Sequence, residues 1–256
     1  MTCSIVLVNW NAGTNLAKAV ASIIQHHQNL VSSVIIVDNA STDDSLACVE
    51  TLTGLPFQIK IIRNPENRGF GAACNQGATL VSSEYVLFLN PDTRLFEDSL
   101  SVPLAFMQRP DTADVGIVGI QLVDEHNHNA RSCARFPSLG IFLAQALGVN
   151  RLPGLRHLNT HMSEWAHDHT ATVDHVIGAF YLMRRLLFES IGGFDQRFFM
   201  YLEDLDFSLR ARDAGWRIVY LAEARAFHAG GGTSRQVKAH RLLYSLGSRL
   251  LYGFKH

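Results

Sequence analysis

The chain has 256 residues, of which 47% are hydrophobic and 18% are charged, with 22 Lys and Arg against 23 Asp and Glu. A formal net charge of −1 provides no electrostatic footprint for a nucleic-acid backbone, so we expect no nucleic-acid partner. The apolar content is too high for a disordered chain. No uninterrupted apolar run approaches the roughly 18 residues of a membrane-spanning helix. These values indicate a globular protein that is long enough for a sizeable core.

The cysteines and the N-terminus bear on the cellular compartment. The cysteines, which are Cys3, Cys48, Cys74 and Cys133, are far apart and form no CxxC pair. This spacing argues against a disulfide framework and against a thiolate metal site. The N-terminus lacks the basic start and the small-residue cleavage site of a secretory signal. We therefore expect a cytoplasmic protein.

Strand-like and helix-like segments alternate in the first part of the chain. Short β-branched runs predict buried strands, and apolar residues at helical spacing predict helices. Ser41, followed by Asp44, predicts a further helix start in the style of a capping box. The alternation predicts an α/β fold whose parallel sheet is covered by helices on both faces. The predicted strands are residues 4–8, 34–37, 59–62 and 85–89, and the predicted helices are residues 16–27 and 71–80.

The rest of the chain is less regular. Residues 124–170 show weak periodicity and several Gly and Pro residues, which favours a binding loop or lid with a short helix at 141–147. Gly215 stands where a helix would end, as its C′ residue. The remaining predicted helices are residues 96–108, 186–191, 203–214 and 236–251, and the remaining predicted strands are residues 115–122, 173–177, 181–183 and 218–221.

Polar residues follow the predicted strands of the first part. Asn9, Asp38, Asn64 and Asp92 each stand at or just after the end of such a strand. In open α/β sheets, ligands bind beyond the carboxyl ends of the strands. Turn chemistry explains each residue singly, because turns prefer Asn and Asp. Taken together, the polar strand ends favour a binding site at one rim of the sheet.

Two short motifs of the first part have the chemistry to bind an anion or a metal. Gly69 and Gly71 open a helix beside Arg68 and can present N–H groups and a cation to a phosphate, although a simple helix start is the alternative. Cys74 occupies the third glycine position of a dinucleotide-binding pattern, so that pattern is absent. Asp92 is a candidate Mg²⁺ ligand, and an Asn-Pro-Asp turn is the alternative.

Acidic residues and histidines are the candidates in the second part. Glu203 and Asp204 begin a helix beside aromatic residues, which can raise a carboxyl pKa toward the range of a general base. The helix dipole alone also explains acids in a first turn. His228, just before a run of glycines, is either a ligand or a turn residue. The histidine pairs at 126/128 and 167/169 suggest zinc, although histidines in polar loops are more often solvated.

Several motifs, in this order along the chain, are similar to those of family 2 glycosyltransferases. They are residues 6–11 (VLVNWN), 37–43 (VDNASTD), 67–73 (NRGFGAA), 89–92 (LNPD), 192–195 (GGFD) and 201–206 (YLEDLD). The sequence most resembles the rhamnosyltransferase branch, with residues 124–170 unmatched. The resemblance implies a GT-A fold, a Rossmann-like and mostly parallel sheet flanked by helices, with a smaller acceptor-side subregion. The implied divisions are one catalytic domain over 1–234, with a nucleotide-sugar-binding half (1–122) and an acceptor half (123–234), and a C-terminal helix over 235–256.

The resemblance also implies roles for single residues. Asp38 would hydrogen-bond a pyrimidine base, Asp92 would hold Mg²⁺ or Mn²⁺, and Asp204 would be the general base. Asn90 replaces the first Asp of the family's usual DxD motif, which predicts weak metal binding without donor. The full set is Val8, Asn9, Asp38, Arg68, Asn75 and Asp92 for the donor, Asp92 and His228 for the metal, Asp204 and Glu203 for catalysis, and Gly178, Ala179 and Tyr201 for the acceptor side.

These expectations describe a metal-dependent, inverting glycosyltransferase. The resemblance implies transfer of rhamnose from dTDP-rhamnose to a glycan or lipid-linked acceptor in cell-surface polysaccharide synthesis. Three alternatives stay open: a UDP-sugar donor in the same fold, an inactive homologue that binds nucleotide sugars, and a zinc hydrolase that uses the histidine-rich loop. The basic, leucine-rich C-terminal helix either packs on the domain or docks peripherally on the inner face of the plasma membrane.

Overall fold

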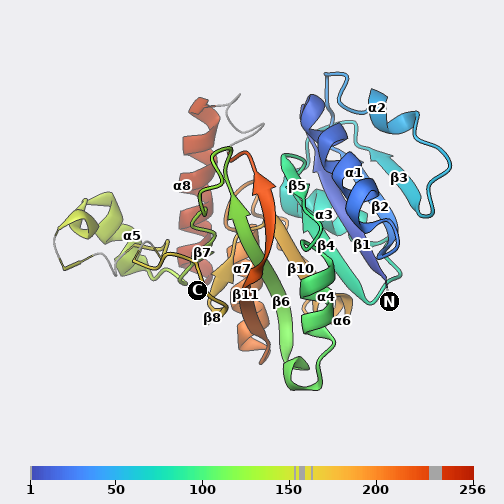
Figure 1. The fold of residues 1–256 in the computed structure, drawn as a ribbon. Coiled ribbons are helices and arrows are strands. Elements are labelled where there is room, and N and C mark those ends of the chain that lie inside the picture. Colours follow the sequence, from blue (N-terminus) through green and yellow to red (C-terminus); the bar gives the residue numbers. More distant parts are fainter. Residues whose placement is uncertain (1, 153, 156–158, 163, 231–237) are drawn as a thin grey trace.

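The computed structural model describes residues 2–152, 154–155, 159–162, 164–230 and 238–256. Its strands are β1 (Cys3–Asn9), β2 (Val31–Asp38), β3 (Gln58–Arg63), β4 (Tyr85–Leu89), β5 (Thr93–Leu95), β6 (Val115–Val123), β7 (Cys133–Ala134), β8 (Ala171–Val173), β9 (His175–Val176), β10 (Phe180–Arg184) and β11 (Arg217–His228). A mixed sheet runs through the centre of the molecule in the order β3-β2-β1-β4-β10-β6-β11-β5, with β8 paired to β11 (Figure 1). A separate two-stranded sheet joins β7 and β9.

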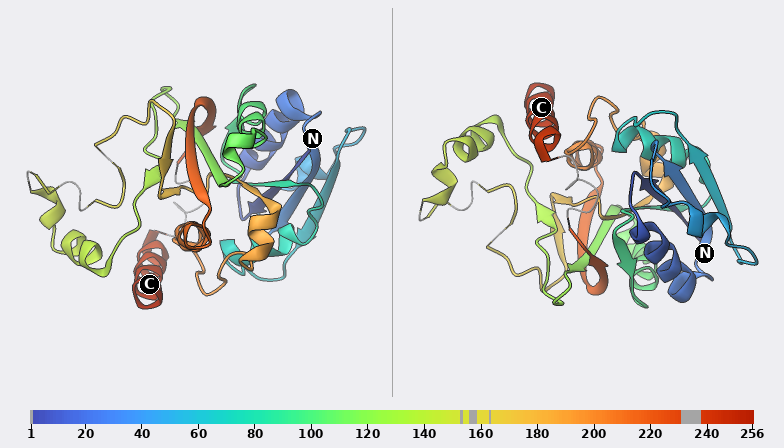
Figure 2. Two further views of the ribbon diagram at one scale, coloured as in Figure 1. Left: turned by 90° about the horizontal axis from the view of Figure 1, so that it is seen from below. Right: turned by 90° about the horizontal axis from the view of Figure 1, so that it is seen from above.

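Helices cover both faces of the central sheet, as predicted (Figure 2). The helices of the described residues are α1 (Thr14–His27), α2 (Ala47–Glu50), α3 (Phe70–Ala78), α4 (Ser101–Met107), η1 (Pro110–Thr112), α5 (Leu139–Ala146), η2 (Val149–Arg151), α6 (Arg185–Ser190), α7 (Glu203–Asp213) and α8 (Lys238–Lys255). Successive strand residues point to opposite faces, so the apolar runs of β1 and β4 serve two cores. Ile5 and Leu87 pack with α1 and α4, whereas Val6 and Phe88 pack with α3, α6 and α7.

The strands β1 to β4 are parallel to one another and end at one edge of the sheet, which we call the binding rim. Asn9 pairs with Asp38 across β1 and β2, and Asp38 pairs with Arg63 across β2 and β3. β10 joins β4 in antiparallel orientation, with Phe180 opposite Leu89, so the residues before β10 enter the same rim. The predicted convergence of polar strand ends is confirmed.

Some predicted elements differ from the structure in the first part of the chain. The helix start predicted at Ser41 is wrong, because its Oγ accepts the backbone N–H of Asn11 at 2.9 Å and the Nδ2 of Asn9 at 3.0 Å. The hydroxyl thereby joins two loops, and the short helix α2 begins only at Ala47. The predicted helix 96–108 is also too long, because α4 begins only at Ser101. Just before it, residues 93–95 form the strand β5, which was not predicted.

Two strand predictions in the second part need correction. The predicted strand 173–177 is interrupted at Asp174, whose Oδ2 accepts the backbone N–H of Phe136 at 3.1 Å. The predicted strand 218–221 is part of the much longer β11, which continues past an irregularity between Leu221 and Arg225 and ends at His228. That extension matters for the site, because it brings the end of β11 to the binding rim.

The C-terminal helix α8 packs against α7 and continues past its predicted end to Lys255. Tyr252 is buried in a cluster with Phe198, Leu205 and Leu209. The buried carboxylate of Asp206 lies 2.6 Å from Nζ of Lys255, which anchors the end of α8. Residues 236 and 237 of the predicted helix lie outside the described residues. Among the described helices, none combines the length and apolar character needed to cross a membrane.

Candidate active site

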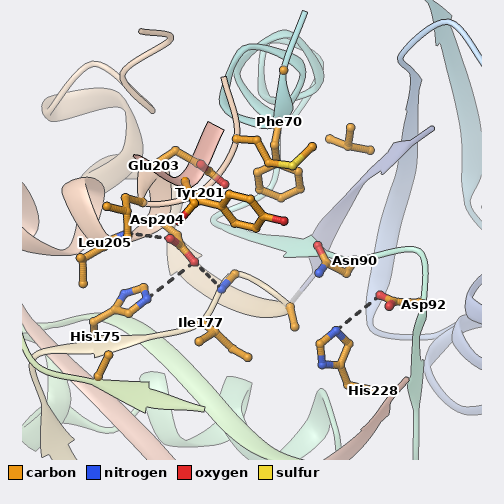
Figure 3. Close-up of a pocket in the computed structure, with 18 of the residues that line it drawn as sticks. Phe70, Asn90, Asp92, His175, Ile177, Tyr201, Glu203, Asp204, Leu205 and His228 are labelled. Atoms are coloured by element: carbon orange, nitrogen blue, oxygen red, sulfur yellow. Dashed lines mark hydrogen bonds and ion pairs between the residues drawn. The ribbon is translucent and has the colours of Figure 1, made fainter. Parts of the chain in front are cut away.

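A cavity of about 510 Å³ opens at the binding rim. Its walls come from the ends of β1 and β4, the loop before β10 and the start of α7, and its outer side comes from α5 and α8. Figure 3 shows the Asp204 carboxylate beside His175 on one side of this pocket and the Asp92–His228 pair on the other. Of the predicted site residues, Val8, Asp92, Gly178, Ala179, Tyr201, Glu203, Asp204 and His228 line the cavity, whereas Asn9, Asp38, Arg68 and Asn75 are not among its lining residues.

Asn9 and Asp38 form a buried pair beneath the rim. Asn9 Nδ2 donates to Asp38 Oδ1 at 2.7 Å, and Asp38 Oδ2 accepts the backbone N–H of Ser41 at 3.2 Å. Asn9 Nδ2 also lies 2.8 Å from Ser45 Oγ. These bonds hold the loops after β1 and β2 together, as expected for buried polar groups. Contact of Asp38 and Asn9 with a nucleotide base stays a prediction.

Gly69 brings the start of α3 into close contact with the segment before α7. Its φ is +84°, and a Cβ there would lie 2.5 Å from the carbonyl oxygen of Phe199, so only glycine fits. The same oxygen accepts the backbone N–H of Phe70 at 3.0 Å. Asn39 holds the preceding loop by donating to Gly69 O at 3.2 Å and to Asn67 Oδ1 at 2.9 Å. The glycine motif therefore joins the start of α3 to the segment before α7, and both line the cavity.

Arg68 and Asn75 lie beside this motif. The Arg68 side chain is exposed. The Asn75 amide is engaged by the backbone of Phe194, because its Oδ1 accepts the N–H and its Nδ2 donates to the carbonyl, both at 2.8 Å. Asn75 thus positions the turn at Gly193, where a Cβ would lie 2.6 Å from Asn75 Oδ1. The predicted phosphate contacts of Arg68 and Asn75 stay predictions.

Asp92 and His228 form a candidate metal site. β5 pairs with the end of β11, and this pairing sets His228 opposite Thr93. As a result, Asp92 Oδ1 lies 3.5 Å from His228 Nε2 at the cavity wall. A carboxylate and an imidazole suit Mn²⁺, and one carboxylate with phosphates and waters suits Mg²⁺. The described residues contain no group of three or more His, Cys, Asp or Glu fit to hold a metal, so the donor diphosphate would have to complete such a site.

The turn into α7 has an unusual backbone. Tyr201 and Leu202 have φ values of +72° and +65°, which are costly for residues with a Cβ and which cluster at functional sites. This turn brings Glu203 and Asp204 to the cavity. Glu203 is only 6% exposed, and in the described structure its Oε2 has no hydrogen-bond partner. Burial and the neighbouring charge of Asp204 raise the pKa of Glu203 to about 8.

The carboxylate of Asp204 is held at the cavity wall by backbone donors. Its Oδ2 accepts the N–H of Gly178 at 2.8 Å, and its Oδ1 accepts the N–H of Leu205 at 2.8 Å. A Cβ at Gly178 would lie 3.1 Å from Asp204 Oδ2, so the glycine permits this close approach. The side chain is 18% exposed and faces the cavity. A carboxylate fixed in this way can accept a proton from a bound hydroxyl.

The cavity wall also contains polar residues that the sequence did not suggest for the site. His175 Nε2 lies 3.6 Å from Asp204 Oδ2. His161 forms a β-bridge to Ala134, and Arg249 comes from α8. These residues stand on separate elements, and only the packing of α8 and the β7–β9 pair brings them together. No sequence spacing identifies them.

The predicted histidine pairs do not form a shared site. His167 is buried, and its ring accepts the backbone N–H of Cys133 and stacks on Trp165. His169 lies 2.9 Å from Asp168, and His128 lies 3.5 Å from Asp124. In this segment His167 is therefore buried in the core, and His128 and His169 pair with neighbouring carboxylates at the surface. This arrangement gives the zinc alternative no support.

The fold and the site define a sugar-transferring enzyme of known type. The chain belongs to glycosyl transferase family 2, whose sequence pattern matches residues 4–192. The N-acetylglucosaminyl-diphospho-decaprenol L-rhamnosyltransferase of Mycobacterium tuberculosis is 26% identical over 265 residues, which covers 98% of this chain and 84% of the relative. Rhamnosyltransferase WbbL of Escherichia coli is 28% identical over 66% of this chain and 61% of its own. The O-antigen chain rhamnosyltransferase WbaN of Salmonella anatum is 26% identical over 91% of this chain and 68% of its own. The resemblance to rhamnosyltransferases is confirmed.

Solved structures of glycosyltransferases share the fold. Residues 1–349 of TarS from S. aureus superpose with a TM-score of 0.63 at 16% identity, over 90% of this chain and 61% of that chain. GalNAc-T7, crystallised with UDP, GalNAc and Mn²⁺, superposes with a TM-score of 0.65 at 17% identity, over 89% of this chain and 43% of that chain. The chain therefore spans less than two thirds of these neighbours. The predicted GT-A fold is confirmed.

Proposed function

We propose that the protein is a metal-dependent, inverting glycosyltransferase that transfers rhamnose from a nucleotide diphosphate. The observation that carries this proposal is that Asp204 and the Asp92–His228 pair line the same cavity, with a candidate base on one side and a candidate diphosphate site on the other. Similarity to rhamnosyltransferases along nearly the whole chain supports the choice of sugar.

The donor lies on the side of Asp92. There Mg²⁺ or Mn²⁺, when bound, supplies positive charge that stabilises the diphosphate leaving group. Val8 and Asn39 line the wall after β1 and β2, where the nucleoside packs against the strand ends. Asn90 stands at the same wall, held by its N–H to the carbonyl of Ala179 at 3.1 Å.

Asp204 acts as the general base. The N–H groups of Gly178 and Leu205 each use one lone pair of its carboxylate, which leaves further lone pairs for the proton of the acceptor hydroxyl. As that proton moves to Asp204, the acceptor oxygen attacks the anomeric carbon on the face opposite the diphosphate, which inverts its configuration. Burial and the neighbouring charge raise the pKa of Glu203 to about 8, which favours its protonated form beside the base.

A panel of nucleotide sugars tests the function and the donor. We expect dTDP-rhamnose with Mn²⁺ to raise the melting temperature, since a ligand at 100 times its Kd stabilises by about 2.7 kcal/mol. Transfer to a prenyl-diphosphate-linked sugar is then followed by mass spectrometry. Stabilisation by UDP-sugars alone would contradict the choice of donor. Donor binding with no transfer to any acceptor would indicate an inactive homologue instead.

Exposed apolar side chains gather on two segments beside the cavity, α5 with η2 and α8, which together we call the α5–α8 ridge. Most of the exposed large hydrophobic side chains of the described residues lie on it, and Phe254 is 88% exposed. Figure 2 shows α5 and α8 on the same side of the molecule, and the rings of Phe142 and Tyr252 join them at 6.2 Å. The ridge consists of Leu143, Leu147, Leu152, Leu242, Leu243, Leu246, Leu250 and Phe254.

We propose that this ridge docks on the inner face of an anionic plasma membrane, where a lipid-linked acceptor for cell-surface polysaccharide would reside. Residues 139–152 and 238–255 contain no Asp or Glu, so they do not repel anionic lipid. Arg249 of α8 and Phe142 of α5 also line the cavity, so the ridge borders the opening through which the acceptor would enter.

Vesicle sedimentation tests the docking. We expect the protein to bind phosphatidylglycerol vesicles more strongly than phosphatidylcholine vesicles. Leu243→Ser/Leu246→Ser/Leu250→Ser should abolish this binding, whereas Leu52→Ser/Leu186→Ser, which changes exposed leucines elsewhere, should not. Equal binding by the two variants would contradict the proposal. So would a dimer, seen by analytical ultracentrifugation, that the ridge variant dissociates.

A further inference from the structure

His175 occupies a buried position directly behind the candidate base. It lies on β9, is 4% exposed and is opposite Ala134 of β7. Its ring contacts two side chains that stand one helical turn apart on α7. Nε2 lies 3.6 Å from Asp204 Oδ2, and Nδ1 lies 2.9 Å from Ser208 Oγ. The imidazole therefore bridges the base and a serine on the same helix.

A tyrosine completes the set of contacts. Tyr181 Oη lies 2.5 Å from Ser208 Oγ and 3.2 Å from the carbonyl oxygen of Asp204. Tyr181 and Ser208 are fully buried, so their hydroxyls interact with protein groups. Asp204, His175, Ser208 and Tyr181 thus form a closed polar network behind the cavity wall (Figure 3 shows its Asp204–His175 contact).

The arrangement of hydrogens in this network follows from the donors and acceptors present. A neutral imidazole carries one N–H, on either nitrogen. A hydrogen on Nδ1 would turn the lone pair of Nε2 toward the Asp204 carboxylate, which is repulsive. A hydrogen on Nε2 faces the carboxylate attractively, and Nδ1 then accepts the hydroxyl of Ser208. The Ser208 oxygen in turn accepts from Tyr181. Only this second arrangement makes both contacts of the imidazole favourable, and the single hydrogen of Tyr181 then goes to Ser208 rather than to the carbonyl of Asp204.

We propose that His175 is a positioning residue that directs an N–H at Asp204 Oδ2, where it faces the negative charge of the carboxylate, and holds that carboxylate toward the acceptor hydroxyl. The inference rests on the proposed function, because it requires Asp204 to be the base. The separation of 3.6 Å is longer than a hydrogen bond, and such contacts often tighten when substrate binds. Burial lowers the pKa of His175, which favours the neutral ring.

Other titratable and charged groups near the pair set the background for a pH measurement. Glu203 and Cys74 lie beside Asp204, and His161 and Asp174 act on His175. Arg249 acts on His161 from α8, and Asp206 and Arg210 lie further along α7 near Tyr181. A change at position 175 leaves each of these side chains in place. A shifted pH profile in such a variant therefore reports the loss of the imidazole.

The test compares His175→Phe, which keeps a ring but removes the N–H, with His175→Gln, which supplies an amide N–H. In His175→Phe, we expect the acidic limb of the kcat profile to move up by about one pH unit, with kcat below that limb falling about tenfold. The KM for the donor should change less than twofold, because the donor lies on the side of Asp92. His175→Gln should restore most of both losses.

Several results would overturn the proposal. An unchanged acidic limb in His175→Phe would show that the ring only packs, and a failure of His175→Gln to restore the limb would show that the N–H is irrelevant. If His175→Phe does not fold, Ser208→Ala replaces it, with a smaller shift in the same direction expected and no shift contradicting the idea. Asp204→Asn tests the proposed function separately from the role of His175, because unchanged transfer in that variant would refute the proposed function itself.

Discussion

Nε2 of His228, at the end of β11, lies 3.5 Å from Oδ1 of Asp92, in the turn before β5, although the two residues are far apart in the sequence. The pairing of β5 with the end of β11 creates this relationship. One carboxylate and one imidazole leave most of a metal's coordination shell to be completed by water and phosphate. Metal and donor nucleotide should therefore bind together, each weakly without the other.

Loss of the Asp92 carboxylate should remove the dependence of donor-nucleotide binding on the metal. We expect Asp92→Asn to weaken Mn²⁺-dependent binding of a nucleoside diphosphate by at least about tenfold, which is about 1.4 kcal/mol. Calorimetric titration with and without Mn²⁺ measures this effect. Glu97→Gln removes an exposed carboxylate elsewhere and should bind as the unaltered protein does. Equal affinity in Asp92→Asn would rule out this site.

Glu203 should make stability depend on pH. Its pKa is raised in the folded state, so its contribution is full below about 4.5, the ordinary value, and is lost as the pH rises toward about 8. The loss amounts to at most about 1.4 kcal/mol per pH unit in that window. Glu203→Gln cannot ionise, so we expect its free energy of unfolding to fall less between about pH 5 and about pH 8, a window that lies between the ordinary and the raised pKa of Glu203.

Urea unfolding at both pH values measures this difference. Glu97→Gln is the matched control, because it makes the same chemical change on an exposed side chain. If Glu203→Gln shows the same pH dependence as this control and the unaltered protein, Glu203 is not the buried, protonated group that the structure indicates.

Gly69 should tolerate no side chain. Gly69→Ala places a Cβ 2.5 Å from the Phe199 carbonyl oxygen, so the segment leading into α7 must move. Gly54→Ala is the matched control, since Gly54 has a similar φ of +72° but nothing within 4 Å of its Cβ. We expect Gly54→Ala to lose about 1 kcal/mol of stability and keep its activity. Gly69→Ala should lose more stability and most of the transfer activity; equal behaviour in thermal unfolding and transfer assays would argue against the close contact.

Lys255 should anchor α8 to α7. Its Nζ lies 2.6 Å from the buried Asp206 and 2.7 Å from Asp195. Lys255→Met leaves part of this negative charge without a partner, and we expect a loss of about 1.5–3 kcal/mol. Lys18→Met, which removes an exposed lysine, should cost little in the same urea titration. Equal midpoints for the two variants would show that the contact contributes nothing.

The local parts of this fold could be predicted from the sequence. Residues 85–89 form a strand within the predicted bounds, because a continuous β-branched and aromatic run is typical of a buried parallel strand. The polar residues after β1, β2 and β4 reach one rim because parallel strands end together. Asp92, Glu203 and Asp204 could be selected for the same reason: each stands where a regular element begins or ends at that rim.

The remaining features depend on contacts between distant segments. β5 has only three residues, too few for a periodic signal, yet it sets His228 beside Asp92. Ser41 has the pattern of a helix cap, but the competing bonds from Asn9 and Asn11 exist only in the folded chain. His175 reaches Asp204 through the packing of β9 on α7, and no spacing in the sequence reveals that approach.

The proposed function depends on removal of the acceptor proton by Asp204. Single-turnover transfer from a bound donor, compared between the unaltered protein and Asp204→Asn, measures this step. We expect the transfer rate to fall by about 10²–10⁴, the usual contribution of a general base, while the donor Kd from calorimetry changes less than about twofold. Transfer at an unchanged rate in Asp204→Asn, with donor still bound, would contradict the assignment.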